Sequence, residues 1–294
     1  MKFVILFLIH VVSIPGLLAQ IDPIVFQSGI FSAGNITGTA INAEDVLLAG
    51  GSQSLRAVNV TDLYAVGNIS LISANVNGEL ALGGTLSQKA SRVNSIHFFL
   101  EPKYNFQQIQ NGLVELSTEL SQRLSNGTLQ RIDFNHVRLV GNDPVLNIFD
   151  AGDFYFNDQV EFDVPPASIA ILNMKGRSPN FSMITFNRPS AGYLGIDPGR
   201  VLVNFPGVTS LSVDYSQIGG TLLAPSARLN LQATSVYGTA IGAGIVATGA
   251  NFYDRPFVGV EQRVVSEPVS EVGLLVGGMM AIVSLRIGMD RGGL

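Results

Sequence analysis

The heptapeptide NVNGELA at residues 75–81 recurs along the chain, and this recurrence decides the fold class. Related segments are SVYGTAI at residues 235–241 and QIGGTLL at 217–223, with degenerate copies at 43–48 and 60–65. One aligned position is occupied in turn by Asp45, Asp62, Gly78, Gly220 and Gly238. The steps between neighbouring copies are 17, 16 and 18 residues. A fixed period of this length predicts a repeat architecture in which each unit stacks on the next.

The period matches one coil of a β-solenoid, which holds a few short strands and tight corners in about 20 residues. Glycine and aspartate suit such corners because they tolerate unusual backbone angles. We therefore interpret the five aligned residues as coil corners and expect Ile69, Leu71 and Ile218 to point into the coil interior. A β-sandwich also has short strands at regular spacing and is the alternative. The repeated position favours the parallel β-helix, an all-β fold.

One segment departs from this pattern. Its apolar residues are spaced by 4, 3, 4 and 4 positions, as Ile109, Leu113, Leu116, Leu120 and Leu124. This spacing predicts a single α-helix over about residues 105–125, with Asn126 and Gly127 as its C-terminal cap. Because the sequence contains only one such helix, we expect it to pack alongside the solenoid.

The composition excludes several classes of protein. The 294 residues include 17 Lys+Arg, 22 Asp+Glu, 32 glycines and no cysteine. The absence of cysteine excludes disulfides, Cys-based metal sites and a thiol nucleophile. A net charge of −5 without a basic cluster argues against a nucleic-acid partner.

The N-terminus has the pattern of a secretory signal peptide. Lys2 precedes an apolar run, Pro15 and Gly16 interrupt it, and Ala19 offers a small residue for cleavage. We assign residues 1–19 to this signal, with a buried N-terminal strand as the alternative. The domain that follows covers residues 20–260.

The C-terminus is also apolar. Residues 272–285 carry no charge, Arg286 follows them, and Ser266-Glu267-Pro268 lies in a linker at 261–271. The arrangement resembles the PEP-CTERM sorting tail of exported bacterial proteins, although Ser266 stands where that family has its first proline. The resemblance implies a short apolar helix in residues 272–294, a membrane anchor and processing by a sorting protease of the exosortase type. A simple tail anchor or a core helix is the alternative.

Seven short segments carry a second resemblance. They are LAGG (48–51), ALGG (81–84), GNDPVLNIF (141–149), VLVNFP (201–206), GGTLLAP (219–225), GTAI (238–241) and NFYDRPF (251–257). Together they resemble the choice-of-anchor A domain, an adhesive module of bacterial surface proteins, some of which are labelled collagen-binding-like. Asp45 and Val203 depart from that family, which usually has glycine and often an aromatic residue there. The resemblance implies an extracellular-matrix, glycan or cell-surface partner.

Residues that could perform chemistry are few. His97 and His136 have no metal-ligand spacing, and no Gly-x-Ser-x-Gly segment is present. The densest acidic stretch lies between residues 150 and 163. It alternates with phenylalanine, which predicts a strand, and it lacks the spacing of known calcium loops. We therefore predict no catalytic residue, no cofactor and no enzyme activity, with calcium binding as an open alternative.

Three functions remain. The first is an exported, surface-anchored structural or adhesive protein that uses a solenoid face to contact matrix, glycan or another cell. The second is a β-helix enzyme acting on polysaccharide, which needs paired carboxylates on one open face. The third is an ice-binding-like surface, which predicts a regular Thr-x-Thr ladder. Thr37-Gly38-Thr39 is the only such pair noted.

Overall fold

A computed structural model describes residues 21–151, 159–175, 180–182, 185–186 and 196–259. The chain divides into two compact units, Met1–Val260 and Glu261–Leu294. All described residues belong to the first unit, so the predicted signal peptide, linker and C-terminal tail lie outside them.

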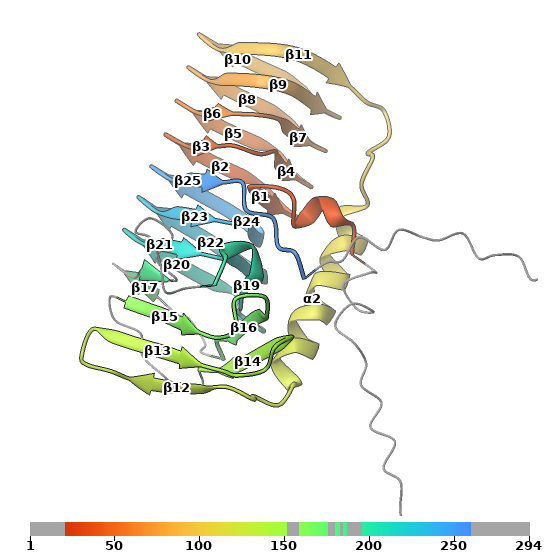
Figure 1. Cartoon of the computed structure of the whole chain (residues 1–294). Helices are drawn as coiled ribbons and strands as arrows, with labels where there is room; N and C mark the ends of the chain where they lie inside the picture. Colours follow the sequence, from red (N-terminus) through yellow and green to blue (C-terminus); the bar gives the residue numbers. More distant parts are fainter. Residues whose placement is uncertain (1–20, 152–158, 176–179, 183–184, 187–195, 260–294) are drawn as a thin grey trace, which may run out of the picture. The chain divides into compact units, whose positions relative to one another are not determined.

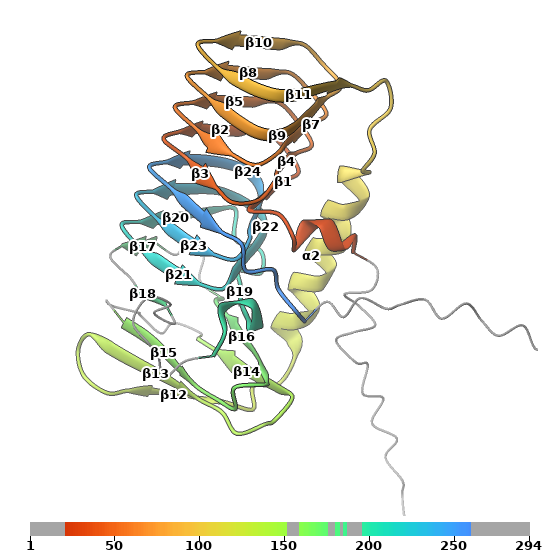
Figure 2. The same cartoon turned by 45° about the horizontal axis from the view of Figure 1, so that its top comes forward.

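The first unit is a stack of coils with three faces (Figures 1 and 2). Face A is built by β1 (Ile30–Ser32), β4 (Leu47–Ala49), β7 (Leu63–Ala65), β14 (Leu146–Asp150), β16 (Ile169–Asn173) and β19 (Val201–Asn204). Face B is built by β2 (Ile36–Thr39), β5 (Gln53–Arg56), β8 (Ile69–Ile72), β10 (Leu86–Lys89), β17 (Asn180–Ser182) and β20 (Ser210–Asp214). Face C is built by β3 (Asn42–Ala43), β6 (Asn59–Val60), β13 (His136–Val140), β15 (Gln159–Asp163), β18 (Thr185–Phe186), β21 (Gln217–Gly219), β23 (Ser235–Tyr237) and β25 (Asn251–Tyr253).

Four longer strands each continue from one face to the next. β9 (Asn75–Leu82) and β11 (Arg92–Phe98) run from face C into face A, whereas β22 (Thr221–Gln232) and β24 (Ala240–Thr248) run from face A into face B. Among the described strands, every pairing is parallel except that of β12 (Thr128–Arg131) with β13. The prediction of an all-β parallel solenoid is thereby confirmed.

The order of the coils in space differs from their order in the sequence. The first coil lies between the second coil and the last one, because β1 pairs with both β4 and β24 and β3 pairs with both β6 and β25. From this middle coil the chain proceeds to the end formed by β10 and β11, which we call the upper end (Figure 1). It then returns along face A and continues from β12 and β13, at the lower end, back to the first coil.

The coil interior is mostly apolar. Ile69, Leu71 and Ile218 are each about 1% exposed and belong to this core, as predicted. Gln53 is a polar exception among these inward-facing residues. In the register of adjacent strands it lies between Ile36 and Ile69. Its Nε2 donates to the carbonyl oxygens of Leu47 and Tyr64, at 3.0 and 2.9 Å, so the buried amide is held by backbone acceptors.

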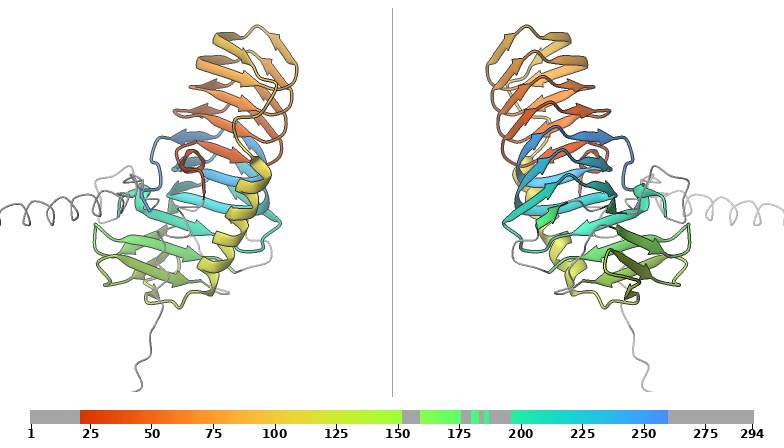
Figure 3. Two further views of the ribbon diagram at one scale, coloured as in Figure 1. Left: turned by 90° about the vertical axis from the view of Figure 1, so that its right-hand side faces the viewer. Right: turned by 90° about the vertical axis from the view of Figure 1, so that its left-hand side faces the viewer.

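Face A is covered by α2 (Phe106–Gln122), which begins at the N-cap Asn105 (Figure 3). At about 1.5 Å per residue its 17 residues reach about 26 Å, or about five coils at 4.8 Å each. Leu113, Leu116 and Leu120 are at most 1% exposed against the face. The prediction of one helix packed alongside the solenoid is confirmed.

The predicted C-terminal cap of this helix is wrong. The helix ends at Gln122, and Leu124, the last member of the predicted apolar stripe, is 91% exposed. The backbone N–H groups of Asn126 and Gly127 both donate to the carbonyl oxygen of Ile148. Asn126 and Gly127 therefore attach the chain to β14 instead of closing the helix, because strand pairing competes for the same backbone groups.

Two short 3₁₀ turns complete the unit, η1 (Pro23–Val25) and η2 (Pro198–Arg200). Among the described residues, no helix combines the length and the apolarity needed to cross a membrane.

Candidate functional site

Face B presents a row of short side chains that are all polar except Val246. In the register of adjacent strands, one outward column contains Ser87, Ser70, Ser54, Thr37, Val246, Asn230 and Ser212. All of them are at least partly exposed. Neighbouring members are one coil apart, about 4.8 Å. Small side chains at a constant spacing give this part of the face a low relief.

The neighbouring outward column of face B is less uniform. Its members, in the same direction, are Lys89, Ile72, Arg56, Thr39, Thr248, Gln232 and Asp214. Thr39 and Thr248 lie side by side where the first and last coils meet. Arg56 and Lys89 give the upper half of the face a positive charge and a higher relief.

Face C carries an asparagine ladder. Asn42 donates to Asn251 and Asn75 donates to Asn59, both at 3.0 Å between Nδ2 and Oδ1. The Asn42–Asn251 bond joins the first coil to the last coil. Among the described coils, this is the only boundary at which neighbouring coils do not follow one another in the sequence. Tyr237 and Tyr253 stack next to this ladder, with ring centroids 4.4 Å apart.

Carboxyl groups gather at the same boundary. The backbone N–H of Asp254 donates to Glu44 Oε2 at 3.0 Å. Burial raises the pKa of Asp45 to about 7, and the nearby Asp254 and Glu44 add to this shift. Asp45, one of the predicted corner residues, therefore has acidic neighbours from both ends of the described chain, Glu44 and Asp254.

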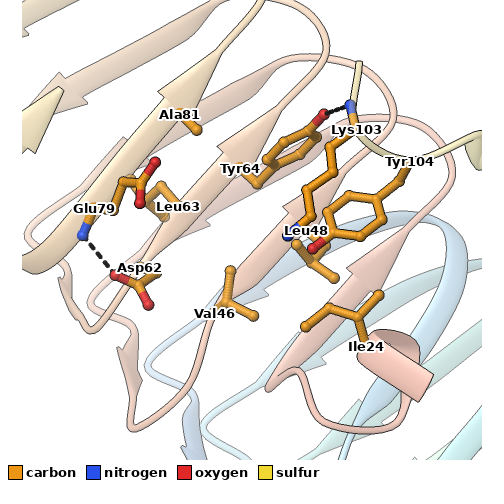
Figure 4. Close-up of a pocket in the computed structure, with 10 residues that line it drawn as sticks. All are labelled: Ile24, Val46, Leu48, Asp62, Leu63, Tyr64, Glu79, Ala81, Lys103 and Tyr104. Carbon is orange, nitrogen blue, oxygen red and sulfur yellow. Dashed lines mark hydrogen bonds between the residues drawn. The ribbon is translucent and has the colours of Figure 1, made fainter. Parts of the chain in front are cut away.

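A pocket of about 250 Å³ opens on face A beside Lys103 and Tyr104, in the segment that leads into α2 (Figure 4). Val46, Leu48 and Ala81 form an apolar floor, with Ile24 of η1 at one edge. Asp62 and Glu79 stand on one side of the floor, and Lys103 and Tyr104 stand on the other. The pocket is thus bordered by acidic groups on one side and by a cation and a phenol on the other.

Aromatic rings in contact with one another support the pocket. Tyr64 is only 7% exposed, with its ring centroid 4.9 Å from that of Phe99 and 5.1 Å from that of Tyr104. Its hydroxyl oxygen accepts a hydrogen bond from the backbone N–H of Lys103 at 2.7 Å. This bond fixes the segment between β11 and α2 against the solenoid.

The structure places the five predicted corner residues at the change from face C to face A. Gly220 and Gly238 have φ values of +151° and +146°, where a Cβ atom is unfavourable. A Cβ atom on Gly78 would lie 2.1 Å from Asp62 Oδ1. This glycine is required by close approach, because Asp62 Oδ1 accepts the backbone N–H of Glu79 at 2.5 Å.

The corner from face B to face C was missed by the sequence reasoning. It has positive φ at Ala40, Ala57, Ser73, Ala90, Tyr215 and Ala233. None of these residues is glycine, asparagine or aspartate, so the composition of this corner carries no signal for a left-handed backbone. Only Gly249, the last corner of this kind in the described chain, has the expected residue type.

The remaining candidates are separated from one another. His97 Nε2 lies 3.9 Å from Glu79 Oε1, and His136 Nε2 lies 2.8 Å from Glu161 Oε2. In the described part of the chain, no three His, Cys, Asp or Glu side chains come close enough to hold a metal ion. Ala19, Ser266, Glu267, Pro268 and Arg286 lie outside the described residues.

Residues 26–253 match the model of a family described as "Putative Ice-binding-like adhesive domain". The match covers more than half of the chain, and the chain belongs to this family. The expectation of an adhesive domain is confirmed at this level. No match was found among curated proteins.

Solved structures of ice-binding proteins are similar to this chain at low identity. One, from the Antarctic ascomycete Antarctomyces psychrotrophicus, has 9% identity and a TM-score of 0.45, covering 80% of this chain and 98% of its own. A second, from an Antarctic biological consortium, has 13% identity and a TM-score of 0.36, covering 78% and 88%. A third, from Shewanella frigidimarina, has 8% identity and a TM-score of 0.32, covering 79% and 95%.

Proposed function

We propose that this protein is an exported adhesive module that contacts an extended partner through face B. The partner is an extracellular-matrix component, a glycan or the surface of another cell. The single observation that carries the proposal is the first outward column of face B, the level column, in which every member except Val246 is Ser, Thr or Asn. No described segment covers this column, whereas α2 covers about five coils of face A. Its regular spacing of about 4.8 Å offers many weak contacts to a repetitive surface.

The ends of the chain complete this proposal. A signal peptide at residues 1–19 directs export, and the tail at 272–294 holds the protein in the membrane until a protease of the exosortase type acts on the Ser266-Glu267-Pro268 region. The choice-of-anchor A resemblance supports the same arrangement and makes collagen a suitable first partner to test.

Ice binding is the second candidate, and the family description favours it. Thr37, Thr39 and Thr248 lie together on face B, as a hydroxyl lattice requires. However, Arg56 and Lys89 occupy the same column as Thr39, and their long side chains interrupt a flat match to ice. Thermal hysteresis of the full chain distinguishes this candidate from adhesion.

Support for polysaccharide cleavage is weaker than that for adhesion or ice binding. Asp62 and Glu79 supply two carboxylates beside one pocket, but the Glu79 side chain is 55% exposed. A general acid is usually buried among apolar groups that keep it protonated. Release of soluble product from a glycan panel would favour the enzyme over the adhesin.

Blocking face B tests the adhesive proposal. The double variant Ser54→Tyr/Ser70→Tyr places two large rings on the level column, whereas Ser235→Tyr places one on face C as the control. We expect binding of the full chain to immobilised collagen or to a glycan array to fall at least about tenfold in the first variant alone. Equal binding by both variants and the wild type would show that face B is not the contact surface.

A further inference from the structure

We propose that the pocket on face A binds one pyranose residue of a glycan. This site is separate from face B, so it does not depend on the adhesive contact proposed above. The residues that carry it are Asp62, Glu79, Lys103, Tyr104 and the aliphatic floor beneath them.

The size and floor of the pocket suit a single sugar ring. Its volume of about 250 Å³ is slightly below the range of roughly 300–1,000 Å³ for drug-sized ligands. Val46, Leu48 and Ala81 offer an apolar surface to the C–H groups on one side of a pyranose. Burial of that side against the floor provides the non-specific part of the affinity.

The acidic side of the pocket accepts hydrogen bonds. Asp62 is fixed in place because its Oδ1 atom accepts the Glu79 backbone N–H at 2.5 Å. A carboxylate has about four lone-pair positions, so both Asp62 and Glu79 retain acceptors for sugar hydroxyl groups. Charged acceptors form stronger hydrogen bonds to hydroxyls than neutral ones do.

The opposite side supplies donors. Lys103 Nζ lies 5.1 Å from the centroid of the Tyr104 ring, and a hydrogen bond with Tyr104 raises the pKa of Lys103. The lysine is therefore a protonated donor, held near the phenol hydroxyl, which both donates and accepts. The hydrogen bond from the backbone N–H of Lys103 to the Tyr64 hydroxyl holds the backbone that carries both side chains in place before a ligand arrives.

A sugar ring makes use of all three parts at once. Its rim of hydroxyl groups faces the acceptors on one side and the donors on the other, while its C–H face covers the floor. A simple ammonium ion would contact only Asp62 and Glu79. It would leave Lys103 and the floor without a role, so the geometry favours the sugar.

The test is saturation-transfer NMR on the full chain with four probes at about 10 mM, the weak range expected for single sugars. The probes are the methyl glycosides of glucose, galactose and mannose, and N-acetylglucosamine; n-butylamine serves as the cationic comparison. We expect transfer to at least one sugar. The variants D62N and E79Q should each weaken its binding about tenfold, as expected for loss of a charged acceptor.

Controls separate this result from misfolding and from face B. D163N removes an exposed carboxylate on β15 and should leave sugar binding unchanged, as should Ser54→Tyr/Ser70→Tyr. Thermal unfolding of D62N and E79Q verifies that they are folded. Absence of transfer to every sugar, equal transfer in wild type and pocket variants, or stronger binding of n-butylamine than of any sugar would each overturn the proposal.

Discussion

Faces A and B are built by the same coils yet carry opposite kinds of side chain. On face A the outward residues of three successive coils are Phe31, Leu48 and Tyr64, which lie opposite one another in the register of adjacent strands. On face B the outward residues of the same coils are Thr37, Ser54 and Ser70. Face A is covered by α2, and face B is covered by no described segment (Figure 3).

This difference shows how a repeat fold can place one face in a second core and leave another exposed. The inward residues of every coil fill the same apolar core, so the outward residues can differ from face to face. Face A adds a second core and a buried polar network. In it, Asn204 Nδ2 donates to Asn173 Oδ1 at 2.8 Å, and Ser117 Oγ donates to Asn204 Oδ1 at 2.6 Å. No described segment covers face B, and its outward side chains are at least partly exposed.

The largest expected effect comes from opening the core of face A. Leu116 is 0% exposed, so Leu116→Ala leaves a cavity between α2 and the coils and should cost about 3 kcal/mol of unfolding free energy. The matched control is Leu124→Ala, which removes the same atoms from a side chain that is 91% exposed and should cost less than about 0.5 kcal/mol. Urea unfolding measures both. Similar losses in the two variants would mean that α2 does not contribute to the stability of the solenoid.

This pair also shows what the sequence could predict. The 4, 3, 4 and 4 spacing was sufficient to find the helix and the side that it buries. It could not separate Leu116 from Leu124, because the end of the helix depends on the pairing of Asn126 and Gly127 with Ile148, a residue more than 20 positions away. Periodicity is local information, and the end of this helix is fixed by tertiary contacts.

The order of the coils in space could not be predicted from the sequence for a similar reason. Each coil presents the same kind of edge, so nothing in β1 indicates that β24, about 210 residues later, pairs beside it. The pocket was missed because it combines residues from η1, three coils and the segment before α2. The available signal was the repeated corner position, which marked Asp62 and the glycine before Glu79 but gave no reason to expect Lys103 beside them.

An intermediate effect is expected at the boundary between the first and last coils. In the folded protein the pKa of Asp45 is about 7, against 3.8 for the ordinary group. The folded state therefore binds this proton more tightly than the unfolded state. The resulting stability is fully present below about pH 4 and is lost as the pH rises toward and through 7.

We expect a loss of about 1 kcal/mol between pH 5 and pH 8, well below the full linkage value, because the carboxyl group is only half buried. Asp45→Asn is neutral at every pH and should reduce this loss, most clearly as a higher melting temperature than wild type at pH 8. Asp163→Asn, on an exposed carboxylate, should retain the wild-type dependence. Thermal unfolding at the two pH values, followed by circular dichroism, measures these differences. A pH dependence of stability in Asp45→Asn as large as in wild type would contradict the assignment of the raised pKa to Asp45.

The smallest effect on stability is expected on face B, where the same chemical change can be compared directly with face A. Ser117→Ala breaks a buried bond to Asn204 and should cost about 2 kcal/mol, because an acceptor is left buried without its donor. Ser70→Ala removes a partly exposed hydroxyl from the level column and should change the unfolding free energy by less than about 0.5 kcal/mol. Urea unfolding gives both values, and collagen or glycan binding of the folded variants gives the second comparison. If Ser70→Ala destabilised the protein as much as Ser117→Ala, the hydroxyls of face B would be structural, and the face would not be a surface kept free for a partner.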